Sequence, residues 1–485
     1  SRRQRQMCIR DSMYTNNMFD KQKIPFLVIC LAALPVEALA HASEQGLVML
    51  LPTELYTLGG TLAVAASILL LTFLPVKALD GVFQSRKFGT DWMIKKIEAL
   101  TLAFAFVVFS GLIFIGFNGP NDPQSNLLPL FIWTGWWVGV FVIQGLVFDI
   151  WRLINPWTGM ARALSLESSA VFNLPKRMGY WPAVLVFFFF QLFLLADIAP
   201  SDPDRLATFV LGYWLFTFGG IVLFGADQWL NRVECFTVMF RLIGSLRVLQ
   251  TENEYRMGVP GWSSIATAPL DASRAVLCLM ILISGSFDGL HETFWWLGKI
   301  GINPLEFPGR SAVVWSSSLG LLCANILGVS IYGSAIWVGL VLVREFGNVK
   351  NIRFMDAFNT FAVTILPIAL GYHFAHYFIS FIVQVQYLAA TIADPLAKGW
   401  NLFGLGRLTV TVGFLKSMES VRQILLTIVF VIISSHVLSV IMAHRLAARF
   451  CDTRRGMILV QCGLSLLMII YTIFGLWLLS TPRGA

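Results

Sequence analysis

The stretch FNTFAVTILPIALGYHFAHYFISFIVQVQY, residues 358–387, decides the fold class. It contains no Asp, Glu, Lys or Arg. A helix needs about 20 predominantly apolar residues to cross the hydrocarbon core of a bilayer, so the stretch predicts a spanning helix. Membrane β-barrels show alternating strands of about ten residues instead. We therefore expect an all-α, polytopic transmembrane helix bundle.

The rest of the chain agrees with this fold class. Of its 485 residues, 57% are hydrophobic and 13% are charged, whereas soluble domains carry about 25% charged residues. This composition excludes a soluble enzyme, a disordered chain, a coiled coil and a disulfide scaffold. About ten apolar runs reach or approach spanning length. They lie near 55–74, 99–117, 127–150, 180–198, 206–226, 273–286, 317–343, 358–385, 421–442 and 460–479.

Polar side chains follow one face of the 358–387 helix. His373, His376, Ser380 and Gln384 recur at spacings of three and four residues, which places them on the same side of a helix. Such groups are costly against lipid, so this face should look into the bundle or into a watered cavity.

A proline precedes this polar face. Pro367 removes one helical hydrogen bond, and interrupted helices with polar residues at mid-depth often build transport sites. The residues that we assign to a substrate pathway are Pro367, Tyr372, Tyr377, Ser380 and Gln384.

Two groups of residues are candidate metal ligands. His373 and His376 can direct two imidazoles to one ion, although they could equally hydrogen-bond neighbouring helices or line a polar pathway. The segment SFDGLHETFWW, residues 286–296, places Asp288, His291 and Glu292 just past the outer end of the 273–286 run. The alternative for this segment is an interfacial aromatic belt with solvated charges. The metals that we consider are copper and zinc.

The beginning of the chain is interpreted separately. Residues 1–12 have the character of translated adapter sequence, and residues 13–40 combine lysines, a short apolar run and an A-x-A site, as a cleaved signal peptide does. Residues 41–485 would then form a single transmembrane domain. Cleavage would leave His41 with a free amine, and this pair of nitrogens could chelate Cu(II). The alternative is that His41 begins a mobile tail.

The distribution of charge indicates the orientation. Counted loop by loop, 20 Lys and Arg follow the odd-numbered runs and seven lie in the other loops and the tail. Cytoplasmic loops are enriched in these residues, so we expect the mature N-terminus outside. The net charge of +8 then reflects topology and a lipid bilayer rather than a nucleic-acid partner.

Three segments carry a family resemblance. They are HFAHYF at 373–378, QVQYLAATIADPLAKGWNLFG at 384–404 and HASEQGLVMLLPTELYTLGG at 41–60. Together with the Asp288–Trp296 segment, they resemble a family of bacterial polytopic membrane proteins, some of which are named fenitrothion hydrolase. The resemblance covers most of residues 41–480. It implies a multi-pass protein of the bacterial inner membrane and hydrolysis of an organophosphate ester.

Three functions follow from these observations. A transporter or metal-handling permease explains the interrupted helix and its histidines. A membrane-embedded, metal-dependent hydrolase agrees with the resemblance, and a non-catalytic membrane assembly factor needs none of these residues. The expected partners are the lipid bilayer, a small molecule or metal ion, and other membrane proteins.

Overall fold

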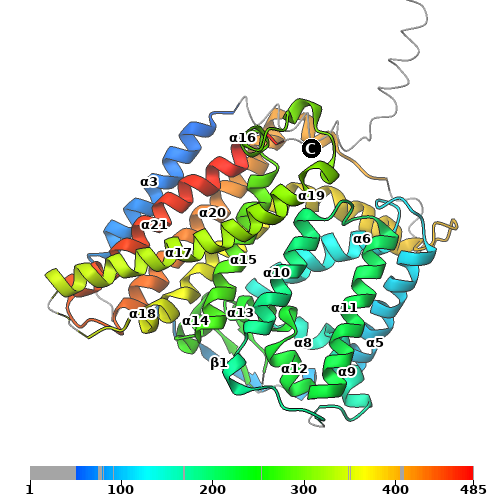
Figure 1. Cartoon of the computed structure of the whole chain (residues 1–485), viewed down its shortest axis with the longest axis horizontal. Coiled ribbons are helices and arrows are strands. Elements are labelled where there is room, and N and C mark those ends of the chain that lie inside the picture. The colour runs from blue at the N-terminus through cyan, green and yellow to red at the C-terminus, as the bar shows by residue number, and fades with distance from the viewer. Residues whose placement is uncertain are drawn as a thin grey trace, which may run out of the picture. The chain divides into compact units, whose positions relative to one another are not determined.

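The computed structural model describes residues 51–74, 79, 81–90, 92–167, 170–252, 254–347, 349, 351–404 and 409–483. The predicted adapter sequence, the signal peptide and His41 lie outside these residues. Residues 52–411 and 424–484 form one unit, and 412–423 belong to another. The arrangement below concerns the first unit (Figure 1).

The described residues are mostly helical, which agrees with the all-α prediction. In the first half of the chain the helices are α3 (Thr53–Leu71), α5 (Trp92–Asn118), α6 (Leu127–Leu130), η1 (Phe131–Val140), α7 (Phe141–Leu146), α8 (Trp151–Ile154), α9 (Pro156–Ala163), η2 (Lys176–Met178), α10 (Trp181–Ala196), α11 (Pro203–Phe224), α12 (Ala226–Arg232) and α13 (Cys235–Gly244). In the second half they are α14 (Trp262–Thr267), α15 (Ala272–His291), α16 (Phe294–Lys299), η3 (Pro304–Glu306), η4 (Arg310–Val313), α17 (Val314–Phe346), α18 (Phe354–Phe361), η5 (Ala362–Ile365), α19 (Leu366–Ala393), η6 (Gly413–Lys416), α20 (Met418–Ala447) and α21 (Arg454–Ser480).

The expected apolar runs are helical over most of their described residues, and residues 147–150 are an exception at the end of one run. Nine helical stretches among the described residues are long and apolar enough to cross a membrane. The expected run near 180–198 forms α10, which is too short to be counted among these nine. Its 16 residues extend only about 24 Å at 1.5 Å per residue. The protein is therefore a multi-pass membrane protein by its helices, while the count of ten spans stays a prediction.

A small antiparallel sheet joins two loops. Strand β1 (Arg86–Thr90) pairs with β3 (Glu254–Met257), which also pairs with β2 (Leu249–Gln250). Lys87 and Glu254 form an ion pair of 2.7 Å across the first of these pairs. The loop after α3 and the loop after α13 are thereby held together.

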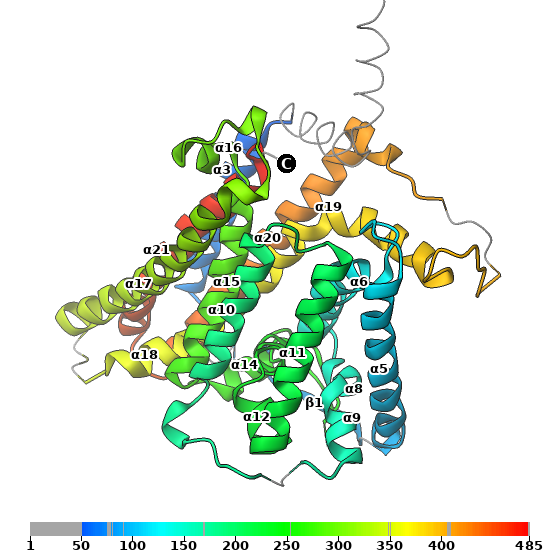
Figure 2. The same cartoon turned by 45° about the vertical axis from the view of Figure 1, so that its right-hand side comes forward.

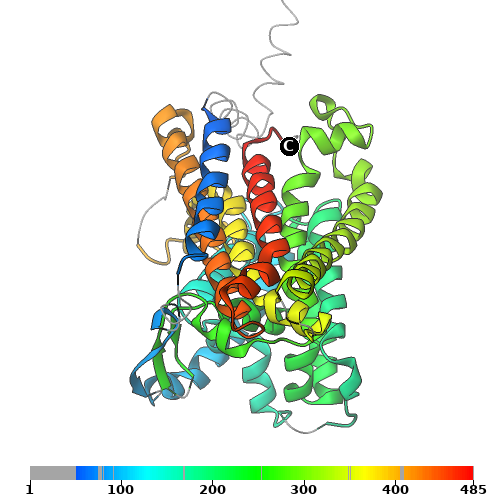
Figure 3. The same cartoon turned by 90° about the vertical axis from the view of Figure 1, so that its left-hand side faces the viewer.

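Helix α15 lies among many of the other helices. It contacts α10, α13, α17, α19 and α21. Figure 2 shows α11, α8 and α5 to the right of it, and Figure 3 shows α3, in blue, beside the red α21. Because 78% of the residues in the most apolar stretch of α15 are buried in protein, this helix can carry polar side chains that lipid would not tolerate.

Glycines allow α17 and α21 to approach closely. A Cβ atom on Gly339 of α17 would lie 2.1 Å from the carbonyl oxygen of Val460, and one on Gly463 of α21 would lie 2.1 Å from that of Ala335. Membrane helices associate through such small residues, because lipid tails leave packing as a main driving force.

The segment 231–250 contains a buried helix. Its spacing of Phe236, Phe240 and Ile243 against arginines is typical of a helix lying among lipid headgroups. In the structure all three side chains are buried in the protein core, because α7, α10, α12, α15 and α19 surround α13. The pattern reflects contacts with neighbouring helices rather than a membrane surface.

Candidate metal site

The candidate site lies where the last turn of α15 meets the middle of α19. Asp288 is buried, and its carboxylate atom Oδ2 lies 3.1 Å from Nε2 of His376. The hydroxyl of Tyr377 donates a hydrogen bond to the same oxygen. Both groups contact Oδ2. Neither His376 nor Tyr377 contacts the other carboxylate oxygen, Oδ1.

His291 follows Asp288 by one helical turn. Its Nδ1 atom lies 2.7 Å from the carbonyl oxygen of Asp288 and 3.2 Å from that of Phe287. A carbonyl oxygen can only accept a hydrogen bond, so Nδ1 carries the proton. In the neutral ring the Nε2 atom of His291 then keeps a lone pair, which is the form in which imidazole binds a metal.

Glu292 completes a group of three ligand residues. One ligand atom each from Asp288, His291 and Glu292 lies within 4.8 Å of the others. Asp288 and His291 are both 7% exposed, whereas Glu292 is half-buried. Glu292 therefore forms the side of the group that solvent can reach.

The donor set fits a divalent transition metal. Zinc binds imidazole and carboxylate ligands at about 2.0–2.2 Å in tetrahedral geometry, so its ligand atoms lie about 3.3–3.6 Å apart. The three ligand atoms lie within 4.8 Å of one another, so the group contracts by up to about 1.5 Å when it closes around an ion. Ligating histidines usually donate their other N–H to a carbonyl, and ligating carboxylates are hydrogen-bonded in turn. His291 and Asp288 have these two supports.

His373 is not part of this group, although its ring packs against that of Tyr377. Its Nε2 atom lies 2.7 Å from the carbonyl oxygen of Trp137, and its ring packs against those of Trp137 and Phe141. Trp137 belongs to η1, a ten-residue π-helix. Such wide turns are rare and are frequent at functional sites. His376 contacts Asp288, so the structure directs the two histidines of the predicted pair to different partners.

The other predicted pathway residues lie along α19. Tyr372 is buried, stacks on the ring of His376, and has a hydroxyl without a hydrogen-bond partner among the described residues. Ser380 and Gln384 are half-buried further along the helix. Pro367 lies in the first turn of α19, directly after the 3-10 segment η5. The expected interruption is limited to this 3-10 turn, because helical structure continues from Phe354 to Ala393.

A glycine makes room for Tyr372. A Cβ atom on Gly289 would lie 2.3 Å from the hydroxyl oxygen of Tyr372 and 3.5 Å from Nδ1 of His376. The glycine between Asp288 and His291 thus lets α19 approach the ligand group closely.

Asp197, at the same end of the bundle, has a separate partner. Its carboxylate binds Arg205 at 2.6 and 2.7 Å. Burial alone would raise the pKa of Asp197, but hydrogen bonds from Arg205 and from the backbone of Ala199 outweigh it and hold the pKa below 3.8. Asp197 is a structural ion-pair partner and not a fourth ligand.

No sequence pattern indicated that η1 contacts His373. Trp137 contacts His373 through its backbone carbonyl, and no residue type is required for that contact. The π-helical geometry of FIWTGWWVGV also has no simple apolar period. Comparison of the chain with protein-family models, curated proteins and solved structures gave no match.

Proposed function

We propose that this membrane protein binds a divalent transition metal through Asp288, His291 and Glu292, and that it acts as a metal-handling permease. The observation that carries the proposal is the ligand group at the end of α15 with its supporting hydrogen bonds. Two carboxylates and one neutral imidazole sum to a charge of about −2, which a divalent cation neutralises. Zinc suits this nitrogen and oxygen set better than Cu(I), which prefers sulfur.

Three protein ligands leave at least one coordination position free. A free position allows an ion to enter and leave, as transport requires. Burial of Asp288 and His291 beside a half-buried Glu292 gives the ion one approach, from the end of α15. The charge distribution of the loops supports placing this end on the outer side.

The interruption of the span at Pro367 supports transport further. Helices broken within the membrane, with polar residues after the break, are a common feature of transporter sites. Here a 3-10 turn takes the place of a full break, and it is followed by His373, His376 and Tyr377, of which the last two contact Asp288. The ligand group and the interrupted helix are therefore directly connected.

A hydrolase is the second candidate. The free coordination position that admits an ion in transport would hold a water molecule in a zinc hydrolase, where the metal lowers the pKa of that water to about 7. The family resemblance supports an organophosphate ester as the substrate. A membrane assembly factor would bind no metal at this place.

Metal titration tests the proposal. Chelator-treated protein in lipid nanodiscs is titrated with Zn²⁺ and with Cu²⁺ by calorimetry. We expect one Zn²⁺ per chain, and loss of this binding in His291→Ala and Glu292→Gln. His436→Ala is the matched control, because His436 is also buried and also bonds a carbonyl one turn earlier, at 2.9 Å, but lies on α20. Binding that survives in both ligand variants would refute the site.

Two further assays separate the candidates. Proteoliposomes loaded with a zinc-sensitive dye report transport, and release of nitrophenol from a nitrophenyl phosphate triester reports hydrolysis. We expect zinc-dependent dye fluorescence that His291→Ala abolishes. Ester turnover without zinc flux would favour the hydrolase, and absence of bound metal would favour the assembly factor.

A further inference from the structure

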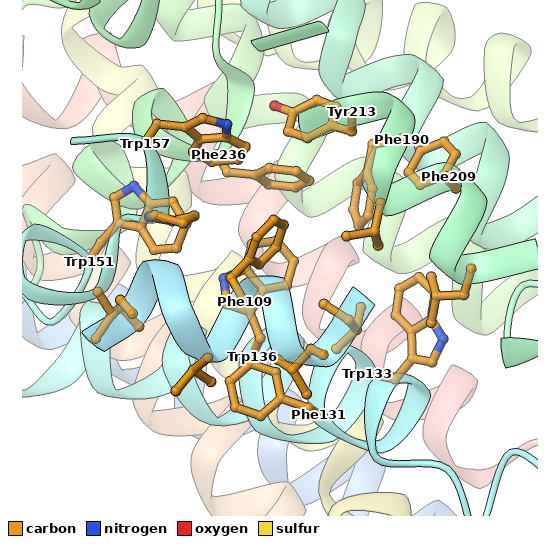
Figure 4. Close-up of a pocket in the computed structure, with 18 of the residues that line it drawn as sticks. Phe109, Phe131, Trp133, Trp136, Trp151, Trp157, Phe190, Phe209, Tyr213 and Phe236 are labelled. Carbon is orange, nitrogen blue, oxygen red and sulfur yellow. The ribbon is translucent and has the colours of Figure 1, made fainter. Parts of the chain in front are cut away.

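An apolar chamber lies between α5, η1, α8, α9, α10, α11 and α13. It has a volume of about 250 Å³, and aromatic side chains form most of its wall (Figure 4). These include Phe109, Trp133, Trp136, Phe190, Tyr213 and Phe236. None of these residues belongs to the candidate metal site.

Three polar groups of the wall are hydrogen-bonded to protein. The indole N–H of Trp133 donates to the carbonyl of Pro200 at 3.2 Å, and that of Trp151 donates to Thr237 at 3.1 Å. The hydroxyl of Tyr213 donates to Glu234 at 2.5 Å. The indole N–H of Trp157 has no hydrogen-bond partner among the described residues. A cavity water needs about two to four polar partners, and one free N–H does not meet this need. The chamber therefore favours an apolar occupant over water.

The most exposed part of the chamber wall lies on an apolar face of α5. Leu100, Phe104 and Val107 are 65–73% exposed and follow one face of α5, which is apolar and so suited to lipid. Phe104 also lines the chamber, and it is the only lining residue that is largely exposed. An occupant would thus enter from the hydrocarbon region.

We propose that the chamber binds a neutral, lipophilic aromatic molecule of one or two rings that is dissolved in the bilayer. A dry cavity of about 150 Å³ accommodates benzene in another protein, so 250 Å³ suffices for a somewhat larger ring system. This proposal is independent of the metal site.

The geometry of the wall favours a planar ligand. Phe236 meets Trp136 at 86° and Phe190 at 84°, so the wall presents both ring edges and ring faces. Aromatic rings prefer offset-stacked and edge-to-face contacts. A rigid ring also loses less conformational freedom on binding than an acyl chain does. These two effects select an arene over the tail of a bilayer lipid.

Photolabelling tests this inference. Protein in nanodiscs is irradiated with 3-(trifluoromethyl)-3-phenyldiazirine, and labelled residues are identified by mass spectrometry. We expect labels on Trp136 and Tyr213 that excess naphthalene reduces at least fivefold. Labelling of Val107, on the lipid-facing side of α5, should resist competition and serves as the internal control.

Two variants of α5 give a matched comparison. Ala105 lines the chamber, whereas Ala103 is exposed on the same helix. Ala105→Phe should abolish labelling of Trp136 and Tyr213, and Ala103→Phe should leave it unchanged. If Ala105→Phe fails to fold, Val210→Phe fills the chamber from α11 instead.

Two results would overturn the inference. The first is labelling confined to lipid-facing residues such as Val107 in the wild type. The second is labelling of Trp136 and Tyr213 that naphthalene does not displace, which would indicate that an acyl chain occupies the chamber.

Discussion

Replacing Tyr377 with Phe removes one hydrogen bond to the Asp288 carboxylate and little else. The Tyr377 hydroxyl and Nε2 of His376 both contact Oδ2 of Asp288, so the variant leaves this oxygen with one donor. A hydrogen bond to a charged group contributes about 1.5–3 kcal/mol. Loss of a group that supports a metal ligand typically lowers metal affinity 10–100-fold, which is about 1.4–2.7 kcal/mol.

The assay is calorimetric titration of Zn²⁺ into chelator-treated protein in nanodiscs. We expect Tyr377→Phe to bind Zn²⁺ 10–100-fold more weakly than the wild type does. Tyr332→Phe is the control, because Tyr332 is also a buried tyrosine and donates to the carbonyl of Phe358 at 2.9 Å, away from the ligand group. A Tyr377→Phe affinity within twofold of the wild type, or an equal loss in Tyr332→Phe, would refute the supporting role of Tyr377.

Three further predictions follow from single contacts. Gly289→Ala should weaken Zn²⁺ binding in the same titration, because its Cβ would lie 2.3 Å from the Tyr372 hydroxyl; unchanged affinity would show that α19 can move away freely. Gly339→Ala should cost about 1–3 kcal/mol of unfolding free energy in a denaturing-detergent titration, whereas Gly212→Ala, with no atom within 4 Å of the added Cβ, should cost nothing measurable; equal effects would contradict the α17–α21 contact. Asp197 has a lowered pKa, so its ion pair stabilises the fold above pH 3.8 and loses this effect as the pH falls through the lowered pKa. The melting temperature of the wild type should therefore exceed that of Asp197→Asn at pH 7 and approach it in acid, and a difference that does not depend on pH would argue against the ion pair.

The helices could be predicted from the sequence because lipid imposes a simple requirement on them. Each expected span is helical over most of its described residues, and the 3-10 turn before Pro367 agrees with the missing N–H of proline. The predicted run ends at Ser286, which is too early, because Asp288 and His291 interrupt the apolar sequence. The helix continues to His291, since these polar side chains are buried against protein rather than lipid.

The candidate site could be predicted only in part. Asp288, His291 and Glu292 stand out by residue type and lie within one turn of a helix, so their proximity is a local property. The contacts of Asp288 with His376 and Tyr377 depend on the packing of α15 against α19, which joins residues almost 90 positions apart. No local pattern encodes that packing. His373 contacts a backbone carbonyl oxygen. Every residue type has a backbone carbonyl, so the sequence does not identify this partner.

X-ray absorption at the zinc edge tests the central claim most directly. The protein is loaded with one equivalent of Zn²⁺ in nanodiscs, and the ligands around the ion are counted by type. The account predicts a single imidazole nitrogen at about 2.0–2.1 Å together with carboxylate oxygens, and loss of the imidazole signal in His291→Ala. Two or more imidazoles per zinc ion, with the signal lost in His373→Ala and kept in His291→Ala, would contradict it.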